Sequence, residues 1–220
     1  ASQGDDLTGA LAQLAETVAD AAEPVLQQAI PSELPSGELN AHAMAQVIGA
    51  VLPENLILVD ESNTSGASLP FTTVGSPRHD ILTLTGGAIG QGLPLATGAA
   101  IACPDRKVLC LEADGSAMYS IQALWTHARE ELDIVTVILN NSAYSILRME
   151  LTRVGAEAGG EKANDLFDIS RPDLDFVSIA KGMGVPATRV TTCEELAAQM
   201  RAAFEAPGPQ LIDAVLDPLF

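Results

Sequence analysis

Short apolar runs alternate with longer amphipathic stretches along most of the chain. The runs are continuously apolar, which is typical of strands buried on both faces of a parallel sheet. The predicted strands are Leu56–Val59, Ile81–Leu84, Lys107–Leu111, Ile134–Leu139, Ala187–Val190 and Gln210–Val215. Predicted helices occupy 40–51, 91–102, 119–130, 176–183 and 194–205. Strands that each lead into a crossover helix predict a doubly wound α/β domain, with a mostly parallel six-stranded sheet and helices on both faces.

The first 37 residues have a different pattern. Residues 5–22 are Ala-rich and place Leu7, Leu11 and Leu14 at helical spacing, which predicts a helix. The stretch from Pro24 to Gly37 contains further prolines and is typical of a linker. We therefore expect residues 1–37 to be an appendage and residues 38–220 to form the sheet domain.

Composition and charge narrow the possible partners. The net charge is −18, from 11 basic and 29 acidic residues, which argues against nucleic acid as a partner. An anionic ligand would have to be held by backbone N–H groups or by a metal. The three cysteines are widely spaced and suggest neither a zinc site nor a disulfide framework, so free thiols in the cytoplasm are expected. No apolar run approaches the roughly 18 residues of a membrane span, so no membrane partner is expected.

Polar or Gly-rich clusters follow four of the predicted strands. They are Asp60–Thr64, Gly86–Gly90, Asp114–Ser116 and Asn140–Asn141. Ligands of open α/β sheets bind beyond the carboxyl ends of the strands. The sequence therefore predicts a ligand site built from these clusters.

Two of these clusters carry oxygen ligands for a metal. Asp114 and Asn141 each follow a strand, and neighbouring parallel strands would place them side by side. Carboxylate and amide oxygens without nearby His or Cys favour Mg²⁺ over zinc or copper. The alternative interpretation is structural: Asp114 caps the helix predicted near Tyr119, and Asn141 closes a turn.

The segment ADGSAMYSIQALWTHAREELDIVTVILNN, at 113–141, resembles the sequence motif of thiamine diphosphate enzymes. In that motif a GDG is followed about two dozen residues later by NN; here 27 positions separate Asp114 from Asn141, and Ala113 replaces the first Gly. The words DESNTS, GGAIGQGLPLATGAA and NNSAYSIL strengthen the resemblance to benzoylformate decarboxylase and acetolactate synthase-like large subunits. The resemblance covers nearly all of residues 38–217 and implies the C-terminal domain of such an enzyme. It implies that residues 1–37 are the tail of a preceding domain and a linker.

The resemblance implies a role for each site residue. Mg²⁺ would be bound by Asp114, Asn141 and the backbone oxygen of Ala143. The apolar side chain of Ile89 would enforce the bent shape of the cofactor, and the Gly87 carbonyl would accept a hydrogen bond from its aminopyrimidine. The diphosphate would contact Asn63, Thr64, Gly115, Ser116, Tyr144 and the N–H of Ser145.

The implied reaction is the decarboxylation or carboligation of a 2-oxo acid, dependent on thiamine diphosphate and Mg²⁺. In this family the Glu that protonates the pyrimidine comes from an N-terminal domain, usually of a neighbouring subunit. The resemblance therefore implies a dimer or tetramer, and a pyrimidine-binding domain supplied either by the same polypeptide or by a separate subunit. Without that domain the chain is expected to have little or no activity.

Two other interpretations use the same residues. The first is a non-catalytic, regulatory subunit that needs a partner chain, although the intact Asp114–Asn141 pair favours cofactor binding. A dinucleotide-binding domain would need GxGxxG after its first strand, and the glycines at 86–90 follow a later strand with different spacing. Finally, the Gly-rich, charged stretch at 155–168 is predicted to be a mobile loop, and the resemblance gives it a closing role over the site.

Overall fold

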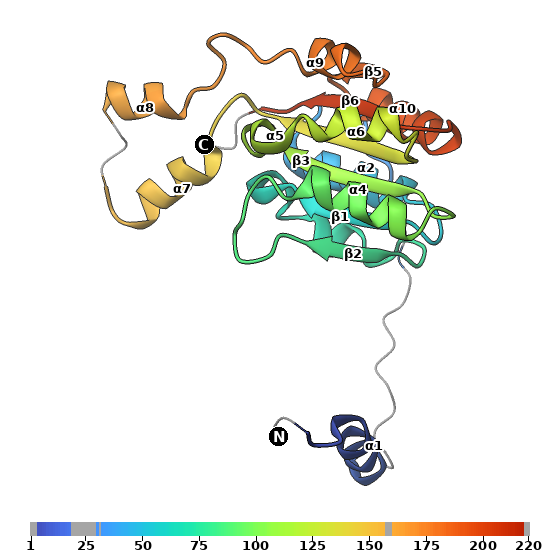
Figure 1. Cartoon of the computed structure of the whole chain (residues 1–220). Helices are drawn as coiled ribbons and strands as arrows, with labels where there is room; N and C mark the ends of the chain where they lie inside the picture. The colour runs from blue at the N-terminus through green and yellow to red at the C-terminus, as the bar shows by residue number, and fades with distance from the viewer. Residues whose placement is uncertain (1–3, 19–29, 31, 157–159, 218–220) are drawn as a thin grey trace.

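The computed structural model describes residues 4–18, 30, 32–156 and 160–217. Six parallel strands form one sheet in the order β2-β1-β3-β4-β6-β5 (Figure 1). The strands are β1 (Ile57–Glu61), β2 (Asp80–Thr83), β3 (Val108–Ala113), β4 (Ile134–Asn140), β5 (Ala187–Val190) and β6 (Gln210–Val215). The predicted α/β class and six-stranded parallel sheet are confirmed.

Helices lie between the strands and cover both faces of the sheet (Figure 1). The helices are α1 (Leu7–Val18), α2 (Ala41–Val51), α3 (Leu69–Thr72), α4 (Gly92–Ala102), α5 (Asp114–Ser120), α6 (Ala123–Arg129), α7 (Ser145–Arg153), α8 (Glu161–Phe167), α9 (Phe176–Gly182) and α10 (Cys193–Glu205), with a short 3-10 helix η2 (Asn63–Gly66) after β1.

The side chains of each central strand divide between two cores. Leu109 and Leu111 of β3 pack with α2 and α10 on one face of the sheet. Val108 and Cys110 of the same strand pack with α4, α6 and α9 on the other face. Both sets are fully buried. This arrangement explains why the strands read as continuous apolar runs, since neither face meets water.

Between β1 and β3 the strand order reverses direction, which makes this position the topological switch point of the sheet. The chain passes from β1 outward to β2 and then returns to add β3 on the opposite side of β1. The connections on the two sides of this point diverge and leave a crevice at the carboxyl ends of the strands. Asn63 follows β1 and Asp114 follows β3, so two of the predicted site clusters flank this crevice.

Strands β1 and β3 extend beyond their predicted ends at Val59 and Leu111. They continue through Glu61 and Glu112, which are paired in parallel register and are both buried. Each predicted strand stopped just before a carboxylate, Asp60 or Glu112; burial of a carboxylate is normally costly.

Two predictions of local structure were wrong. The predicted helix 119–130 is two helices, α5 and α6, separated at Ile121 and Gln122. The first begins at Asp114, because extended Ala113 turns the chain straight from the strand into the helix. The stretch 155–168, predicted to be a loop, contains helix α8; residues 157–159 lie outside the described residues.

The N-terminal helix begins two residues later than predicted. Helix α1 spans Leu7–Val18 of the predicted 5–22, and residues 19–22 lie outside the described part of the chain. None of its described side chains is buried; Leu7, Leu11 and Leu14 are exposed. Of the predicted linker at 24–37, only Ile30 and residues 32–37 are described, and none of these belongs to a helix.

Candidate cofactor and metal site

Asp114 joins the end of β3 to the turn that follows β4. Its Oδ1 accepts a hydrogen bond from the Gly115 N–H (2.7 Å). Its Oδ2 accepts hydrogen bonds from the N–H groups of Asn141 (2.9 Å) and Ser142 (2.7 Å). The structure therefore brings Asp114 and Asn141 together as predicted. Ala113 has φ −72°, a conformation open to any residue, so its replacement of the usual Gly requires no backbone strain.

The electrostatics of Asp114 suit a cation. Burial raises the pKa of its carboxyl to about 6, and the hydrogen bonds from Gly115, Ser142 and Asn141 oppose that rise. The group is thus largely anionic at neutral pH. Within the described residues no group of three or more His, Cys, Asp or Glu side chains could hold a metal ion. A metal at Asp114 would therefore rely on amide and carbonyl oxygens, water and ligand phosphate, a donor set that Mg²⁺ accepts.

The turn after β4 carries the other proposed metal ligands. Asn141 is buried; its Oδ1 accepts a hydrogen bond from the Ala143 N–H (3.1 Å), and its Nδ2 donates to Ser145 Oγ (3.3 Å). The Ala143 carbonyl accepts a hydrogen bond from the Ser145 N–H (2.9 Å). Asn141 thus closes a turn, as the structural interpretation predicted, and it does so beside Asp114. Asn141 Oδ1 and the Ala143 carbonyl oxygen each keep a second lone pair with which to bind a cation.

Asn63 connects the end of β1 to the start of α5. Its backbone is left-handed (φ 50°), a conformation that Asn tolerates better than most residues. Its Nδ2 donates to Ser116 Oγ (2.9 Å) and to the Glu61 carbonyl (3.2 Å). Two residues predicted to contact the diphosphate, from opposite sides of the switch point, are therefore in direct contact.

The Gly-rich segment after β2 brings Ile89 to the site. Gly86 and Gly87 both have left-handed backbones (φ 64° and 71°), which glycine adopts without steric cost. The Ile89 N–H donates to the Gly87 carbonyl (3.0 Å), so that carbonyl retains one free lone pair. The Ile89 side chain is 43% exposed and is therefore not an ordinary core residue.

Glu61 holds the Gly-rich segment after β2 in place, a role that the sequence did not reveal. Its carboxylate is buried and accepts hydrogen bonds from the N–H groups of Gly90 and Gly92. The neighbouring Glu112 is fully buried, and neither of its carboxylate oxygens has a hydrogen-bond partner among the described residues. Burial, and then the charge of Glu61, raise the pKa of Glu112 to about 9, so Glu112 is uncharged at neutral pH.

A cavity of about 240 Å³ lies where these segments converge. All residues predicted to contact the cofactor line it: Asn63, Thr64, Gly87, Ile89, Asp114, Gly115, Ser116, Asn141, Ala143, Tyr144 and Ser145. The lining residues that the prediction missed include Ser65, Leu84 and Ile146. A second cavity, of about 520 Å³, shares Ser65 and Ile146 with the first and extends toward His42. Leu84 and Ile146 could not be identified from the sequence, because an isolated Leu or Ile is indistinguishable from a residue of the hydrophobic core.

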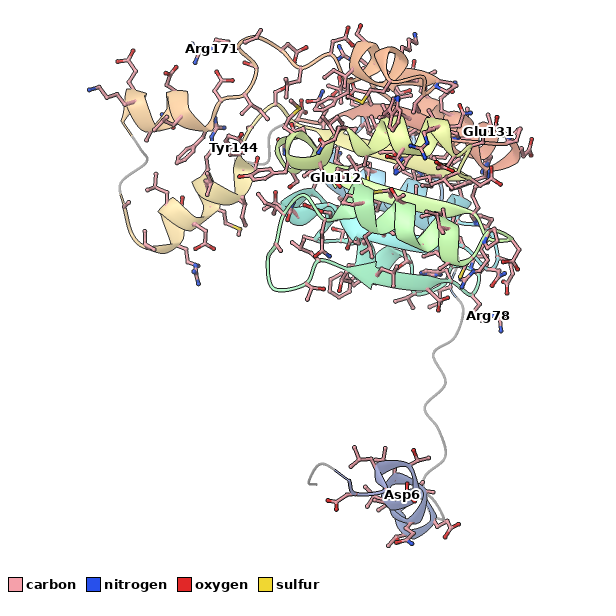
Figure 2. All side chains as sticks on the ribbon, viewed as in Figure 1. Asp6, Arg78, Glu112, Glu131, Tyr144 and Arg171 are labelled. Atoms are coloured by element: carbon pink, nitrogen blue, oxygen red, sulfur yellow. The ribbon has the colours of Figure 1, made fainter. Side chains whose placement is uncertain are left out.

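Tyr144 lies against Gly115 at the mouth of this cavity. A Cβ at position 115 would lie 2.5 Å from Cε1 of the Tyr144 ring. Figure 2 shows Tyr144 between the sheet domain and the segment that carries α7 and α8. Any larger residue at 115 would therefore displace this ring.

The segment that follows α8 pairs with the turn after β4. The Tyr144 N–H donates to the Phe167 carbonyl (2.9 Å), and the Ile169 N–H donates to the Ser142 carbonyl (3.0 Å). Ala143 and Asp168 form an antiparallel bridge. The predicted closing role of residues 155–168 stays a prediction, but the C-terminal end of this stretch is attached to the site.

Two features bear on the environment of the protein. All three cysteines are free. No helix in the part of the chain that the structure describes is long and apolar enough to cross a membrane.

Known proteins with similar sequences are larger enzymes. The chain is 61% identical over 211 residues to a Mycobacterium tuberculosis protein that carries the name of an acetolactate synthase large subunit, IlvX; the match covers 96% of this chain and 41% of that protein. It is 34% identical over 222 residues to benzoylformate decarboxylase of Pseudomonas aeruginosa, covering 97% of this chain and 40% of the relative. The chain thus spans about two fifths of the length of these relatives.

Solved structures and a family model agree with this likeness. The 4-hydroxybenzoylformate decarboxylase of Rhodococcus jostii RHA1, a thiamine diphosphate-dependent enzyme, superimposes with a TM-score of 0.77 at 30% identity, covering 95% of this chain and 39% of that one. Residues 62–214 match the family described as thiamine pyrophosphate enzyme, C-terminal TPP binding domain; thiamine pyrophosphate and thiamine diphosphate are the same compound. The chain therefore belongs to the C-terminal thiamine diphosphate-binding domain family of acetolactate synthase- and benzoylformate decarboxylase-like enzymes.

Proposed function

We propose that this chain provides the Mg²⁺ and diphosphate half of a thiamine diphosphate site in a 2-oxo-acid decarboxylase or carboligase. The observation that carries the proposal is the contact between Asp114 and Asn141. The Asp114 carboxylate accepts the Asn141 N–H at 2.9 Å, and both side chains line the cavity at the switch point of the sheet. Oxygen atoms that can bind a metal follow the adjacent strands β3 and β4, next to a cavity with backbone N–H groups. This arrangement suits a diphosphate whose charge is neutralised by a metal.

In this proposal Asp114, Asn141 and the Ala143 carbonyl bind Mg²⁺. Asp114 supplies the negative charge, and the two neutral oxygens lie on the single turn that its carboxylate organises. Such a site leaves other coordination positions for water and diphosphate oxygens, which is the usual arrangement for Mg²⁺.

The polar groups on the other side of the cavity bind the diphosphate. Asn63, Thr64 and Ser116 supply amide and hydroxyl donors, and Gly115 allows close approach of the backbone. Tyr144 and the Ser145 N–H complete this set from the turn after β4. That N–H donates to the Ala143 carbonyl in the structure, so it would have to exchange partners when the diphosphate binds.

Ile89 and Gly87 act on the reactive part of the cofactor. The exposed Ile89 side chain supports the bent form of the cofactor, and the free lone pair of the Gly87 carbonyl accepts a hydrogen bond from its aminopyrimidine. Once bound, thiamine diphosphate supplies the electron sink for breaking or forming a bond next to a carbonyl. The residues of this chain orient the cofactor and exclude water from it.

The rest of the enzyme lies outside this sequence. Because the chain spans about two fifths of its relatives, we propose that an N-terminal pyrimidine-binding domain or subunit completes the site. We further propose that residues 1–37 are the tail of the preceding domain and its linker, and that the protein is a dimer or tetramer. The three free cysteines support a cytoplasmic location.

A titration of the chain with thiamine diphosphate tests the half-site directly. Ligand-observed NMR, which detects millimolar affinity, would be run with and without Mg²⁺. We expect binding to require Mg²⁺ and to weaken strongly in Asp114→Asn. The matched control is Asp105→Asn, which removes an equal charge from the exposed, opposite end of β3 and should leave binding unchanged.

Equal losses in Asp114→Asn and Asp105→Asn would mean that net charge, and not a metal ligand, governs binding. Absence of Mg²⁺-dependent binding both in this chain and in the full-length protein would refute the cofactor assignment. Cofactor binding by the full-length protein without release of carbon dioxide from any 2-oxo acid would instead favour the non-catalytic, regulatory role.

A further inference from the structure

Asp213 is a buried carboxylate that the proposed cofactor site does not use. It lies on β6, between β4 and the edge strand β5, and its side chain is fully buried. Its Oδ2 accepts a hydrogen bond from Arg189 Nε on β5 (2.7 Å), and its Oδ1 accepts one from Asn140 Nδ2 at the end of β4 (3.0 Å). A buried ion pair is often no more stabilising than an apolar pair of the same size, so stability alone is a weak explanation for it.

Asn140 passes this interaction on to the turn of the proposed metal site. Because its Nδ2 donates to Asp213, its Oδ1 must face the opposite way. That oxygen accepts hydrogen bonds from the Ser142 N–H (3.3 Å) and the Ser142 hydroxyl (3.2 Å). The Asn140 carbonyl also accepts the Leu216 N–H (2.8 Å), which ties the same residue to the chain beyond β6.

Ser142 is the strained residue of this turn. Its φ is 52°, a left-handed conformation that non-glycine residues adopt only at a steric cost. The same N–H also donates to Asp114 Oδ2 (2.7 Å), so side chains from both sides of the turn hold Ser142 in place. Asn141 and Ala143, two of the proposed metal ligands, immediately flank it.

These residues follow the order of the strands across the sheet. Arg189, Asp213 and Asn140 come from β5, β6 and β4, and Asp114 directly follows β3; these four strands are consecutive neighbours in the sheet (Figure 1). The Arg189 side chain is 39% exposed, whereas Asp213 and Asn140 are buried. A hydrogen-bonded path therefore runs from the edge of the sheet to the back of the metal-site turn.

We propose that Arg189, Asp213 and Asn140 are positioning residues that hold the turn 140–143 in the shape required to bind Mg²⁺. The inference rests on the proposed function, since it concerns the same metal site. None of the three touches the proposed metal. Outer residues of this kind orient metal ligands, and their loss typically costs 10- to 100-fold in metal affinity.

The test compares two variants in the full chain. Asp213→Asn keeps the shape of the side chain and removes its charge. The double variant Arg189→Met/Asp213→Leu replaces the ion pair with apolar side chains of similar size, which keeps the fold if Asp213→Asn alone unfolds it. The control is Arg106→Met, which breaks an ion pair with Asp80 (2.7 Å) at the amino ends of the strands.

Two quantities are measured, and neither is an activity. The first is the Mg²⁺ concentration at which half of the thiamine diphosphate binding is reached. The second is amide hydrogen exchange at Asn141 and Ser142 without metal or cofactor. We expect both Asp213 variants to raise the Mg²⁺ midpoint about 10-fold or more and to speed the two exchanges relative to the rest of the sheet. Arg106→Met should lower stability while leaving both quantities unchanged.

The results separate this inference from the proposed function. If the wild-type chain and the full-length protein show no Mg²⁺-dependent binding, the metal site is refuted, and unchanged exchange at Asn141 and Ser142 refutes the positioning role as well. If the wild type binds with Mg²⁺ and folded Asp213 variants keep both its midpoint and its exchange rates, the positioning role alone is refuted. A purely structural role would move stability and neither of these quantities.

Discussion

Acid sensitivity of the fold should come in large part from His127. This side chain lies on α6, fully buried against α4. Its Nε2 is 3.2 Å from the Leu93 carbonyl and 2.9 Å from Thr97 Oγ1. A carbonyl only accepts, so Nε2 carries the proton, and Nδ1 is left without a partner among the described residues. Burial lowers the pKa of His127 from 6.5 to about 4, so the folded protein holds a neutral ring.

The size and sign of the effect follow from proton linkage. The folded and unfolded pKa values, about 4 and 6.5, differ by roughly 2.5, which corresponds to about 3 kcal/mol at 1.36 kcal/mol per pKa unit. Between these values the unfolded chain binds a proton that the folded chain does not. The contribution is therefore fully present above pH 6.5, falls as the pH drops, and is lost below about pH 4.

The assay is urea unfolding of the wild type and His127→Gln between pH 7 and pH 4.5. Glutamine can still donate to the Leu93 carbonyl but cannot ionise. The free energy difference between wild type and variant should shift by about 2 kcal/mol in favour of the variant from pH 7 to pH 5. His79→Gln, at a partly exposed position, is the control and should show no such shift. Parallel profiles for wild type and His127→Gln would refute the assignment to this ring.

Three further predictions concern the buried carboxyl group of Glu112 and two glycines near the site, Gly90 and Gly115. Glu112→Gln should stabilise the fold increasingly as the pH rises from 4.5 to about 9, because wild-type Glu112 stays protonated when folded and ionises when unfolded; urea unfolding against pH measures this, and a flat difference would contradict it. Gly90→Ala should destabilise by more than 1 kcal/mol, since φ is 89° and the added Cβ would lie 2.5 Å from a neighbouring side-chain carbon, whereas Gly98→Ala in α4 has open space and should stabilise slightly; equal effects in the two variants would refute the argument. Gly115→Ala should weaken thiamine diphosphate binding in the NMR titration by displacing the Tyr144 ring, and Tyr144→Ala should partly restore it; if Gly115→Ala binds like the wild type, the ring does not constrain the site.

The sheet was readable from the sequence because its strands are buried on both faces. Uninterrupted apolar runs such as Ile134–Leu139 have no competing interpretation when Gly- or Asn-rich turns bound them. The last two strands, Ala187–Val190 and Gln210–Val215, were predicted to the residue. Periodicity alone could not place the break between α5 and α6, since neither Gly nor Pro marks it at Ile121 and Gln122.

Most of the residues that line the cavity could be predicted for a related reason. Polar residues directly after buried strands have few structural roles, and parallel strands bring their carboxyl ends to one edge. Buried carboxylates inside strands were not readable. Glu61, Glu112 and Asp213 look like solvent-exposed charges in sequence, and only the structure shows that all three are buried and that Glu61 and Asp213 have hydrogen-bond partners in distant segments. Residues that position a site thus escape sequence reasoning more easily than residues that line it.

The charge of the protein makes the metal a requirement of the proposed site. The chain carries a net charge of −18, and Asp114 adds a largely anionic carboxylate at the cavity itself. A diphosphate placed there without a cation would meet like charge in a partly buried, weakly screened position. A bound Mg²⁺ would remove that repulsion. Binding of metal and of diphosphate must then strengthen each other by the same factor, because the coupling free energy is reciprocal. A site that relied on basic side chains would show no such coupling, and in the part of the chain that the structure describes neither Lys nor Arg lines this cavity.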